Sequence, residues 1–276
     1  MAKKNQSNRL TSQQKENQGV LGIFGGEAKS HDTLVSNVSK KTLLELKRKY
    51  PTLSFRYRIS VSKAEINQVL QSLDKDLGKT LFVQDSNIKP DGGLIEVQDD
   101  NGNWRVILVS EAKHQGKDIE NIQKGIKVGV KNNQDFMVAG NAIERSHKNI
   151  SEIANLMLKE AYFPYVLFLE GSNFLTEDIT VKRPNGEVLT ITYNTGSLNR
   201  LDRLTSANYG MPINTNLCKN KFVTSNNRVI ILQAASIYTE GRGGYWSESN
   251  MLSIMLEIAN TSIQMLSSEL FNQLTK

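Results

Sequence analysis

The chain has 276 residues, of which 38% are hydrophobic and 22% are charged, and this ordinary globular composition excludes wholesale disorder. Its 34 Lys and Arg residues outnumber its 28 Asp and Glu residues, and the formal net charge of +6 is a weak indication of a polyanionic partner. No apolar run reaches the about 18 residues of a membrane span, the polar N-terminus does not resemble a secretory signal, and the single cysteine excludes an internal disulfide framework. We therefore expect a cytoplasmic protein without a membrane partner.

The N-terminal segment differs from the rest of the chain in being polar and basic. Residues 1–18 contain Lys3, Lys4, Arg9 and Lys15 against Glu16. We predict a flexible basic arm over residues 1–18 and a single domain over residues 19–276. The alternative is a solvated terminus that has no role.

Two helices and a β-hairpin are predicted in the first half of the chain. Apolar spacing predicts a helix over residues 31–50, which ends before Pro51, and a shorter helix over residues 64–77. Strand character begins at residues 81–83. It returns on both sides of an Asn101-Gly102 turn, a strong short hairpin signal, so residues 92–110 are predicted to form a hairpin.

Helices alternate with strands in the second half. An amphipathic pattern predicts a helix over residues 143–161, and the continuous apolar run over residues 165–169 predicts a strand buried on both faces. The remaining predicted elements are a hairpin that turns at residues 184–186, a short helix over 198–205, a strand over 228–235 and a long closing helix over 247–274. This alternation predicts an α/β fold.

Two carboxylates and a lysine flank the predicted hairpin. Asp91 precedes its first strand, and Glu111 and Lys113 end its second strand, so the hairpin would place Asp91 beside Glu111. Glu111 and Lys113 are two residues apart and project to the same side of an extended chain. Two carboxylates with few other ligands are typical of a Mg²⁺ site, and a lysine can stabilise the charge that develops on a phosphodiester. The pattern predicts phosphodiester hydrolysis, and the alternative is a surface ion pair at a strand end.

Basic residues accumulate after this motif. Arg145 and Lys148 are predicted in the first turn of the helix over residues 143–161, where the helix dipole disfavours cations unless an anion such as DNA phosphate is bound. Arg200 and Arg203 are three residues apart on one face of the short helix and could contact guanine edges. They could equally pair with Asp202 or Glu144.

Six stretches of the sequence resemble the EcoRI family of type II restriction endonucleases. They are IKPDGG, LVSEAKHQGKDI, AGNAIERSHKNISEIAN, FPYVLFLEGSNFLTE, LNRLDRLTSANYGMPIN and LQAASIYT, within about residues 80–240. The resemblance implies the PD-(D/E)xK restriction-endonuclease fold, in which helices flank a central mixed β-sheet. It also implies a homodimer that needs Mg²⁺ and cleaves double-stranded DNA at the palindrome GAATTC after the first G, leaving 5′ overhangs with 5′-phosphate ends. A partner DNA methyltransferase that protects host DNA is implied as well.

The resemblance also assigns roles to individual residues. Asp91, Glu111 and the Ala112 carbonyl correspond to metal ligands, and Lys113 corresponds to the lysine near the attacking water and the scissile phosphate. Residues that match base-reading positions or support them are Met137, Ala139, Gly140, Asn141, Ala142, Glu144, Arg145, Arg200 and Arg203. Residues that match positions along the phosphate backbone are Lys89, Gln115, Gly116, Lys117, Lys148 and Asn149.

Two alternative functions remain compatible with these residues. One is a related endonuclease that shares the inner AATT but recognises a different outer base pair. The other is a sequence-specific DNA-binding protein that does not cleave, which the intact Asp91, Glu111 and Lys113 argue against.

Overall fold

The computed structural model describes residues 26–79, 86–127, 129–130, 133, 135, 141–191, 220–225, 227–233 and 235–276, with some side chains, including those of 141–144, left out. The predicted arm over residues 1–18, the strand at 81–83 and the short helix over 198–205 lie outside these residues.

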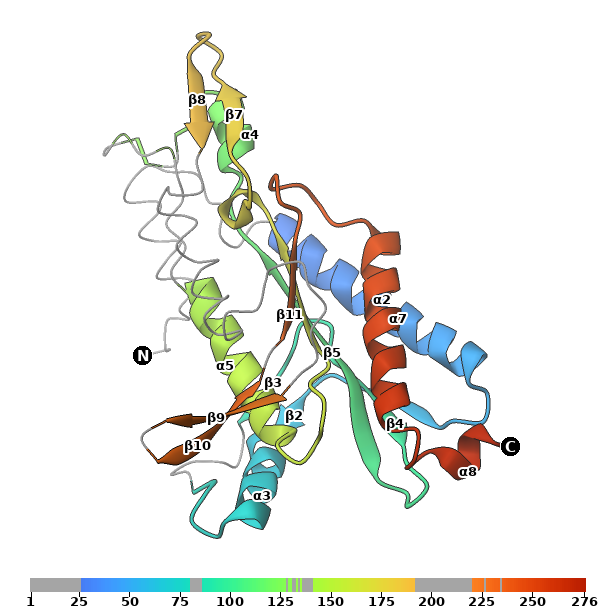
Figure 1. Cartoon of the computed structure of the whole chain (residues 1–276). Coiled ribbons are helices and arrows are strands. Elements are labelled where there is room, and N and C mark those ends of the chain that lie inside the picture. Colours follow the sequence, from blue (N-terminus) through green and yellow to red (C-terminus); the bar gives the residue numbers. More distant parts are fainter. Residues whose placement is uncertain are drawn as a thin grey trace, which may run out of the picture.

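A five-stranded mixed sheet forms the centre of the fold (Figure 1). In spatial order its strands are β1 (Phe55–Arg58), β4 (Leu94–Gln98), β5 (Trp104–His114), β6 (Tyr165–Glu170) and β11 (Ser236–Thr239). β4 runs antiparallel to both of its neighbours, β1 and β5, whereas β5, β6 and β11 run parallel to one another. The predicted α/β class, the central mixed sheet and the hairpin over residues 92–110 are thus confirmed.

Helices cover both faces of this sheet. α2 (Gly26–Lys49) and α7 (Glu248–Met265) lie on one side, and α5 (Asn141–Leu156) lies on the other, in contact with α3 (Lys63–Leu73) (Figure 1). α3 begins with a capping box between Ser62 and Glu65, which satisfies backbone N–H groups of the first turn. The side chain of Ser247 caps α7 in a similar way by accepting from the Asn250 N–H.

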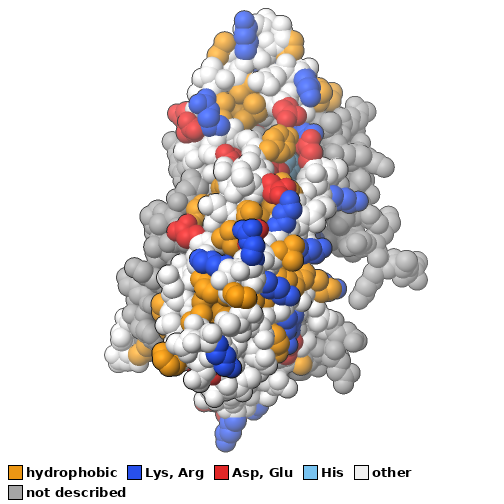
Figure 2. Space-filling model, turned by 90° about the vertical axis from the view of Figure 1, so that its right-hand side faces the viewer, with side chains coloured by type: hydrophobic (Ala, Val, Ile, Leu, Met, Phe, Trp, Pro, Cys, Tyr) orange, Lys and Arg blue, Asp and Glu red, His pale blue; other side chains and the backbone are white. Residues whose placement is uncertain are grey.

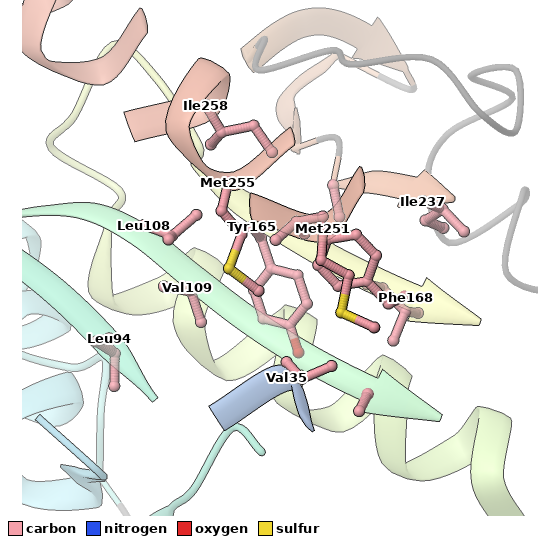
Figure 3. Packing of buried hydrophobic residues seen from close by; sticks show 14 of the residues in the cluster. Val35, Leu94, Leu108, Val109, Tyr165, Phe168, Ile237, Met251, Met255 and Ile258 are labelled. Atoms are coloured by element: carbon pink, nitrogen blue, oxygen red, sulfur yellow. The ribbon is translucent and has the colours of Figure 1, made fainter. Parts of the chain in front are cut away.

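The core lies between the sheet and the α2–α7 layer, and continues on the other side of the sheet. Figure 3 shows Val35 of α2, Phe168 of β6, and Met251 and Met255 of α7 among its members, all of them fully buried. All six residues of β6 are buried, which confirms the strand predicted to be covered on both faces. A parallel strand in the middle of a sheet needs this composition because helices enclose it.

Smaller elements surround the central sheet. Three two-stranded sheets are formed by β2 (Val61–Ser62) with β3 (Asn87–Ile88), β7 (Ile179–Lys182) with β8 (Val188–Ile191), and β9 (Asn220–Ser225) with β10 (Arg228–Gln233). The short helices are α4 (Asp118–Gln123), η1 (Ser172–Phe174) and α8 (Phe271–Leu274). The β7–β8 pair confirms the hairpin predicted around residues 184–186, and β10 confirms the strand predicted from residue 228.

The predicted closing helix over residues 247–274 is wrong because the chain bends after α7. Helix α7 ends at Met265, and α8 begins at Phe271. In the intervening segment the Glu269 carbonyl accepts a hydrogen bond of 2.9 Å from the Asp100 N–H, and the Glu269 carboxylate pairs with Arg105. Leu270 is fully buried by the bend. These tertiary contacts with the β4–β5 turn outweigh local helix propensity.

Three other helix boundaries also differ from the prediction. α2 begins at Gly26 rather than at residue 31, and α3 ends at Leu73 rather than at residue 77. α5 spans Asn141–Leu156 instead of residues 143–161. It ends early because the chain must turn there to bury Phe163 and enter β6.

The α2–α7 side of the molecule has a mixed surface. In Figure 2 its Lys and Arg side chains are interspersed with apolar and a few acidic ones. None of the described helices is long and apolar enough to span a membrane. The chemistry predicted from the sequence lies elsewhere, on the other side of β5.

Candidate active site

The β4–β5 hairpin brings Asp91 and Glu111 together, as the sequence predicts. Leu94 pairs with Val109 near the open end of the hairpin. Beyond this pair, the Asp91 N–H donates to Glu111 Oε2 at 3.3 Å, and the Ala112 N–H donates to Asp91 Oδ2 at 3.3 Å. Each carboxylate is therefore held by the backbone of the other segment.

Two glycines allow the chain after Asp91 to pass close to β5. A Cβ on Gly92 would lie 2.1 Å from Ser110 Oγ, and the Gly92 N–H donates to the Ser110 carbonyl at 2.9 Å. Gly93 has a φ of +71°, and a Cβ there would lie 2.6 Å from the Arg58 carbonyl oxygen. The Asp91-Gly92-Gly93 sequence thus combines a carboxylate predicted to bind the metal with the backbone freedom that its position requires.

Lys113 closes the site from the same side of β5. Its Nζ donates to Asp91 Oδ2 at 2.8 Å and to the Ala112 carbonyl at 2.6 Å, and it also donates to Glu111 Oε1. Oxygens of the three groups predicted as metal ligands therefore converge on one point, which a cationic group occupies. Since hard divalent cations take such oxygen ligands, the donor set fits Mg²⁺, with the ammonium standing in for a cation.

Burial and charge act together on the ionisation of these groups. Glu111 is 1% exposed, and burial, together with the nearby Asp91 charge, raises its pKa against the opposing effect of Lys113. Burial opposes the charge of Lys113, but the Glu111 and Asp91 carboxylates outweigh it and raise the lysine pKa. The site thus contains two carboxylates that need a cation between them.

Asn149 connects α5 to this site. Its amide Nδ2 donates to Glu111 Oε1 at 3.0 Å. The family resemblance assigned Asn149 to the phosphate-backbone surface, whereas the structure shows that it also orients the buried carboxylate. The contact joins residues 38 positions apart, and the sequence contains no local signal for it.

Comparison with known proteins identifies the family. A family model described as restriction endonuclease EcoRI matches residues 17–273. The chain belongs to the EcoRI family of restriction endonucleases. The type II restriction enzyme EcoRI of Escherichia coli is 62% identical over 275 residues, which cover 100% of this chain and 99% of that protein. The type II restriction enzyme RsrI of Cereibacter sphaeroides is 45% identical over 267 residues, covering 97% of this chain and 96% of that protein.

These comparisons confirm several predictions made from the sequence. The chain is a type II restriction endonuclease, an enzyme that acts on DNA, with a central mixed sheet flanked by helices. The roles of individual residues in this EcoRI-family endonuclease remain predictions, because the comparisons do not test them.

The other predicted DNA-contacting residues are only partly placed. Lys89, Arg145 and Lys148 are exposed, while Gln115 and Gly116 are buried at the end of β5 and Lys117 pairs with Glu27. Asn141, Ala142 and Glu144 begin α5, of which only the backbone is described there, and Met137, Ala139, Gly140, Arg200 and Arg203 lie outside the described residues.

The predicted position of two cations in the first turn of α5 is wrong. Because α5 starts at Asn141, Arg145 is its fifth residue and Lys148 its eighth. The helix dipole acts mainly within the first turn, so it gives little support for an anion bound at these two side chains. Their exposure on the α5 surface remains compatible with DNA contact.

A buried cluster of histidines and a carboxylate lies on the α2 side of the sheet, and sequence reasoning missed it. The Glu170 carboxylate contacts His31 Nδ1 at 3.1 Å and His114 Nδ1 at 3.0 Å, and it accepts from the Trp246 N–H at 3.1 Å. Burial alone would raise its pKa, but the hydrogen bonds from His114 and His31 lower the pKa of Glu170 to about 2. The cluster ties α2 to the carboxyl ends of β5 and β6, next to the candidate active site.

Any metal at the candidate active site depends on few protein ligands. The described residues contain no group of three or more His, Cys, Asp or Glu side chains that could hold a metal ion. Two carboxylates and one carbonyl are nevertheless sufficient for Mg²⁺, which retains waters and takes substrate phosphate oxygens as further ligands. This donor set is compatible with the Mg²⁺ site predicted from the sequence.

Proposed function

We propose that this endonuclease cleaves double-stranded DNA at the palindrome GAATTC, after the first G, in a reaction that requires Mg²⁺ and leaves 5′ overhangs with 5′-phosphate ends. The observation that carries the hydrolytic part is the convergence of the Asp91, Glu111 and Ala112 oxygens on the Lys113 ammonium. The choice of GAATTC rests on the full-length similarity to the EcoRI enzyme of Escherichia coli.

In the proposed hydrolysis, different residues of the chain bind the metal, stabilise the developing charge and position the metal ligands. Asp91, Glu111 and the Ala112 carbonyl would hold Mg²⁺, which when bound polarises the phosphodiester and lowers the pKa of the attacking water. Lys113 then stabilises the negative charge that develops on the phosphate oxygens. Asn149 and the Asp91 N–H keep the Glu111 carboxylate in place through their hydrogen bonds.

The proposed substrate has a two-fold symmetry that a dimer can match. A symmetric homodimer places one such site on each DNA strand of a palindrome, so we propose a homodimer. Within it, the segment from Met137 to Arg145, together with Arg200 and Arg203, would recognise bases. The phosphate backbone would be contacted by Lys89, Gln115, Gly116, Lys117, Lys148 and Asn149. We also propose a cytoplasmic location and a partner methyltransferase that protects the same site.

The substitution Asp91→Asn tests the catalytic assignment. It keeps the shape of the side chain but removes the charge that would hold the metal, so cleavage of a plasmid with one GAATTC site should fall by at least about 10²-fold. Asp76→Asn is the matched control, because Asp76 forms an exposed ion pair with Lys79 that contributes little. Normal cleavage by Asp91→Asn would show that the metal site is assigned wrongly.

Sequencing the product ends tests the recognition assignment. Product ends in which one strand begins with 5′-AATTC and the other stops at G support GAATTC, whereas another base pair at the outer position would indicate a related specificity. Binding to the duplex without cleavage at any Mg²⁺ concentration would indicate a DNA-binding protein instead.

A further inference from the structure

Tyr165 is a buried tyrosine whose hydroxyl has no evident structural use. The residue is 0% exposed, and its Oη makes no hydrogen bond of normal geometry within the described part of the chain. An unpaired buried hydroxyl opposes folding, because the group loses its bond to water without a replacement. Neighbouring aromatic residues of the core, such as Phe163 at a ring-centroid distance of 5.8 Å, lack this disadvantage. A phenylalanine at position 165 would meet the demands of packing alone.

The sheet places this hydroxyl on the side of the candidate active site. In the parallel β5–β6 ladder Tyr165 pairs with Val109, and Leu167 pairs with Glu111. Paired residues project to the same face, and so do residues two apart along a strand, so Tyr165 and Glu111 are diagonal neighbours on one face. Figure 3 shows the Tyr165 ring within the packed interior, with its hydroxyl at the end of the ring.

The charges that act on Tyr165 agree with this placement beside Glu111. Burial raises the pKa of Tyr165 well above its usual value, and the charges of Glu111 and Asp91 and a hydrogen-bonding interaction with Glu111 raise it further. A phenol hydroxyl can act as a hydrogen-bond donor. The Glu111 carboxylate, its diagonal neighbour on the same face of the sheet, can accept this hydrogen bond.

The partners of Glu111 must change when the site holds a divalent cation. At present Lys113 and Asn149 donate to Oε1, and the Asp91 N–H donates to Oε2 over a long 3.3 Å. A divalent cation and the Lys113 ammonium cannot occupy one point among the same oxygens, so the lysine must withdraw its bond. The buried carboxylate then needs another donor to keep its orientation.

We propose that Tyr165 is a positioning residue, whose hydroxyl donates a hydrogen bond to Glu111 when Lys113 leaves it and so holds this carboxylate in the orientation that binds the metal. The proposal rests on the proposed function, in which Glu111 is a metal ligand. It explains why a tyrosine occupies a position where the hydroxyl makes no hydrogen bond of normal geometry with the described residues of the free protein.

The test is Tyr165→Phe in the full-length protein, measured through metal binding. Mn²⁺ affinity is determined by electron paramagnetic resonance in the complex with a GAATTC duplex whose scissile linkage is non-hydrolysable. The variant should bind Mn²⁺ about 10-fold more weakly, as expected for one lost hydrogen bond to a charged group. Cleavage at limiting Mg²⁺ should fall by a similar factor, saturating Mg²⁺ should restore most of it, and the melting temperature should stay equal or rise.

Tyr162→Phe is the matched control because it removes a satisfied hydroxyl. Tyr162 is 2% exposed, and its Oη donates to the Val106 carbonyl at 2.8 Å. This variant should lose about 2–4 °C of melting temperature while binding Mn²⁺ as the unmodified protein does. The two tyrosines would thus separate an effect on metal binding from an effect on stability.

The proposal is overturned if Tyr165→Phe binds Mn²⁺ with unchanged affinity, or if it loses stability and metal affinity together as a merely structural residue would. If Tyr165→Phe has no effect but Asp91→Asn abolishes cleavage, the proposed function stands and Tyr165 alone is assigned wrongly. If Asp91→Asn cleaves normally, the proposed function itself fails.

Discussion

In the proposed metal site, Lys113 and a divalent cation would compete for the same oxygens, so removing the lysine should strengthen metal binding in the free protein. The Lys113 ammonium lies 2.8 Å from Asp91 Oδ2 and 2.6 Å from the Ala112 carbonyl, and it also contacts Glu111. Substituting Lys113→Met keeps the length and the apolar stem of the side chain but removes the competing cation. Without DNA, the variant should bind Mg²⁺ more tightly even though its cleavage activity is lost.

The size of this effect follows from the contacts that Mg²⁺ must displace. A hydrogen bond to a charged group contributes about 1.5–3 kcal/mol net. The Lys113 side chain is 16% exposed and that of Glu111 is 1% exposed, so water screens the pair incompletely. Because the released ammonium regains water, we count one such bond rather than three. The expected gain in Mg²⁺ affinity is then about 10–100-fold.

Isothermal titration calorimetry at constant ionic strength measures this affinity, and the rise of melting temperature with Mg²⁺ concentration gives an independent value. Lys117→Met is the matched control: it makes the same change of charge nearby, but Lys117 pairs with Glu27 rather than with the three oxygens. If Lys113→Met binds Mg²⁺ no better than Lys117→Met does, the ammonium does not occupy the metal position and the reasoning is refuted.

Two further predictions concern stability around the site. Burial and then the Asp91 charge raise the pKa of Asp32 from 3.8 to about 6. Ionisation of Asp32 therefore lowers the folding stability as pH rises through that interval, and the loss persists at higher pH. The largest possible loss is about 3 kcal/mol, or about 1 kcal/mol after solvent screening of this partly exposed group. Asp32→Asn should therefore raise the melting temperature at pH 8 but hardly at pH 4, and an equal shift at both pH values would contradict this cause. Gly92→Ala should destabilise the fold by about 1–3 kcal/mol, because its Cβ would meet Ser110 Oγ at 2.1 Å and Val35 Cγ1 at 2.9 Å. Chemical denaturation measures this loss of stability. Gly244→Ala is the control, because its Cβ would have its nearest contact at 3.8 Å, and its stability should change little. Equal losses in the two variants would contradict the steric argument.

The geometry of the candidate catalytic group was predictable because it depends on short-range rules. The Asn101-Gly102 turn fixes a hairpin, the hairpin brings its two open ends together, and the two-residue spacing of Glu111 and Lys113 puts them on one face. Each of these steps uses residues that are close in sequence. The contacts at 3.3 Å between the Asp91 and Glu111 segments show that the local rules were sufficient here.

Contacts between distant elements were not predictable from one sequence. The histidine–carboxylate cluster joins His31 of α2, His114 of β5 and Glu170 of β6. The sequence around each of these residues contains no signal that predicts its contact with the other two. The bend after α7 depends on Arg105 and Asp100 of the β4–β5 hairpin. In both cases tertiary bonds over more than 50 residues decide the structure, whereas periodicity describes only the local preference.

Consecutive side chains of β5 point alternately toward the α2 core and toward the candidate active site. Ser110 of β5 faces α2, where its Oγ bonds Ser39 Oγ at 2.6 Å, and the next residue, Glu111, faces α5 and Asn149. A one-residue slip of β5 in the sheet would exchange the side chains on its two faces, because every side chain of a slipped strand turns to the opposite face.

The β4–β5 register therefore controls the site. This register contains an irregularity: Ile95 pairs with Leu108 but Glu96 pairs with Val106, so β5 has one extra residue at Ile107. Such a bulge bends a strand and redirects the side chains that follow it. Without it, the same turn would align Leu94 with Leu108 instead of Val109. Asp91 would then meet the α2-facing side of β5, and the carboxylates could not converge on Lys113. The bulge lies outside the candidate active site, yet it determines which face of β5 carries that site.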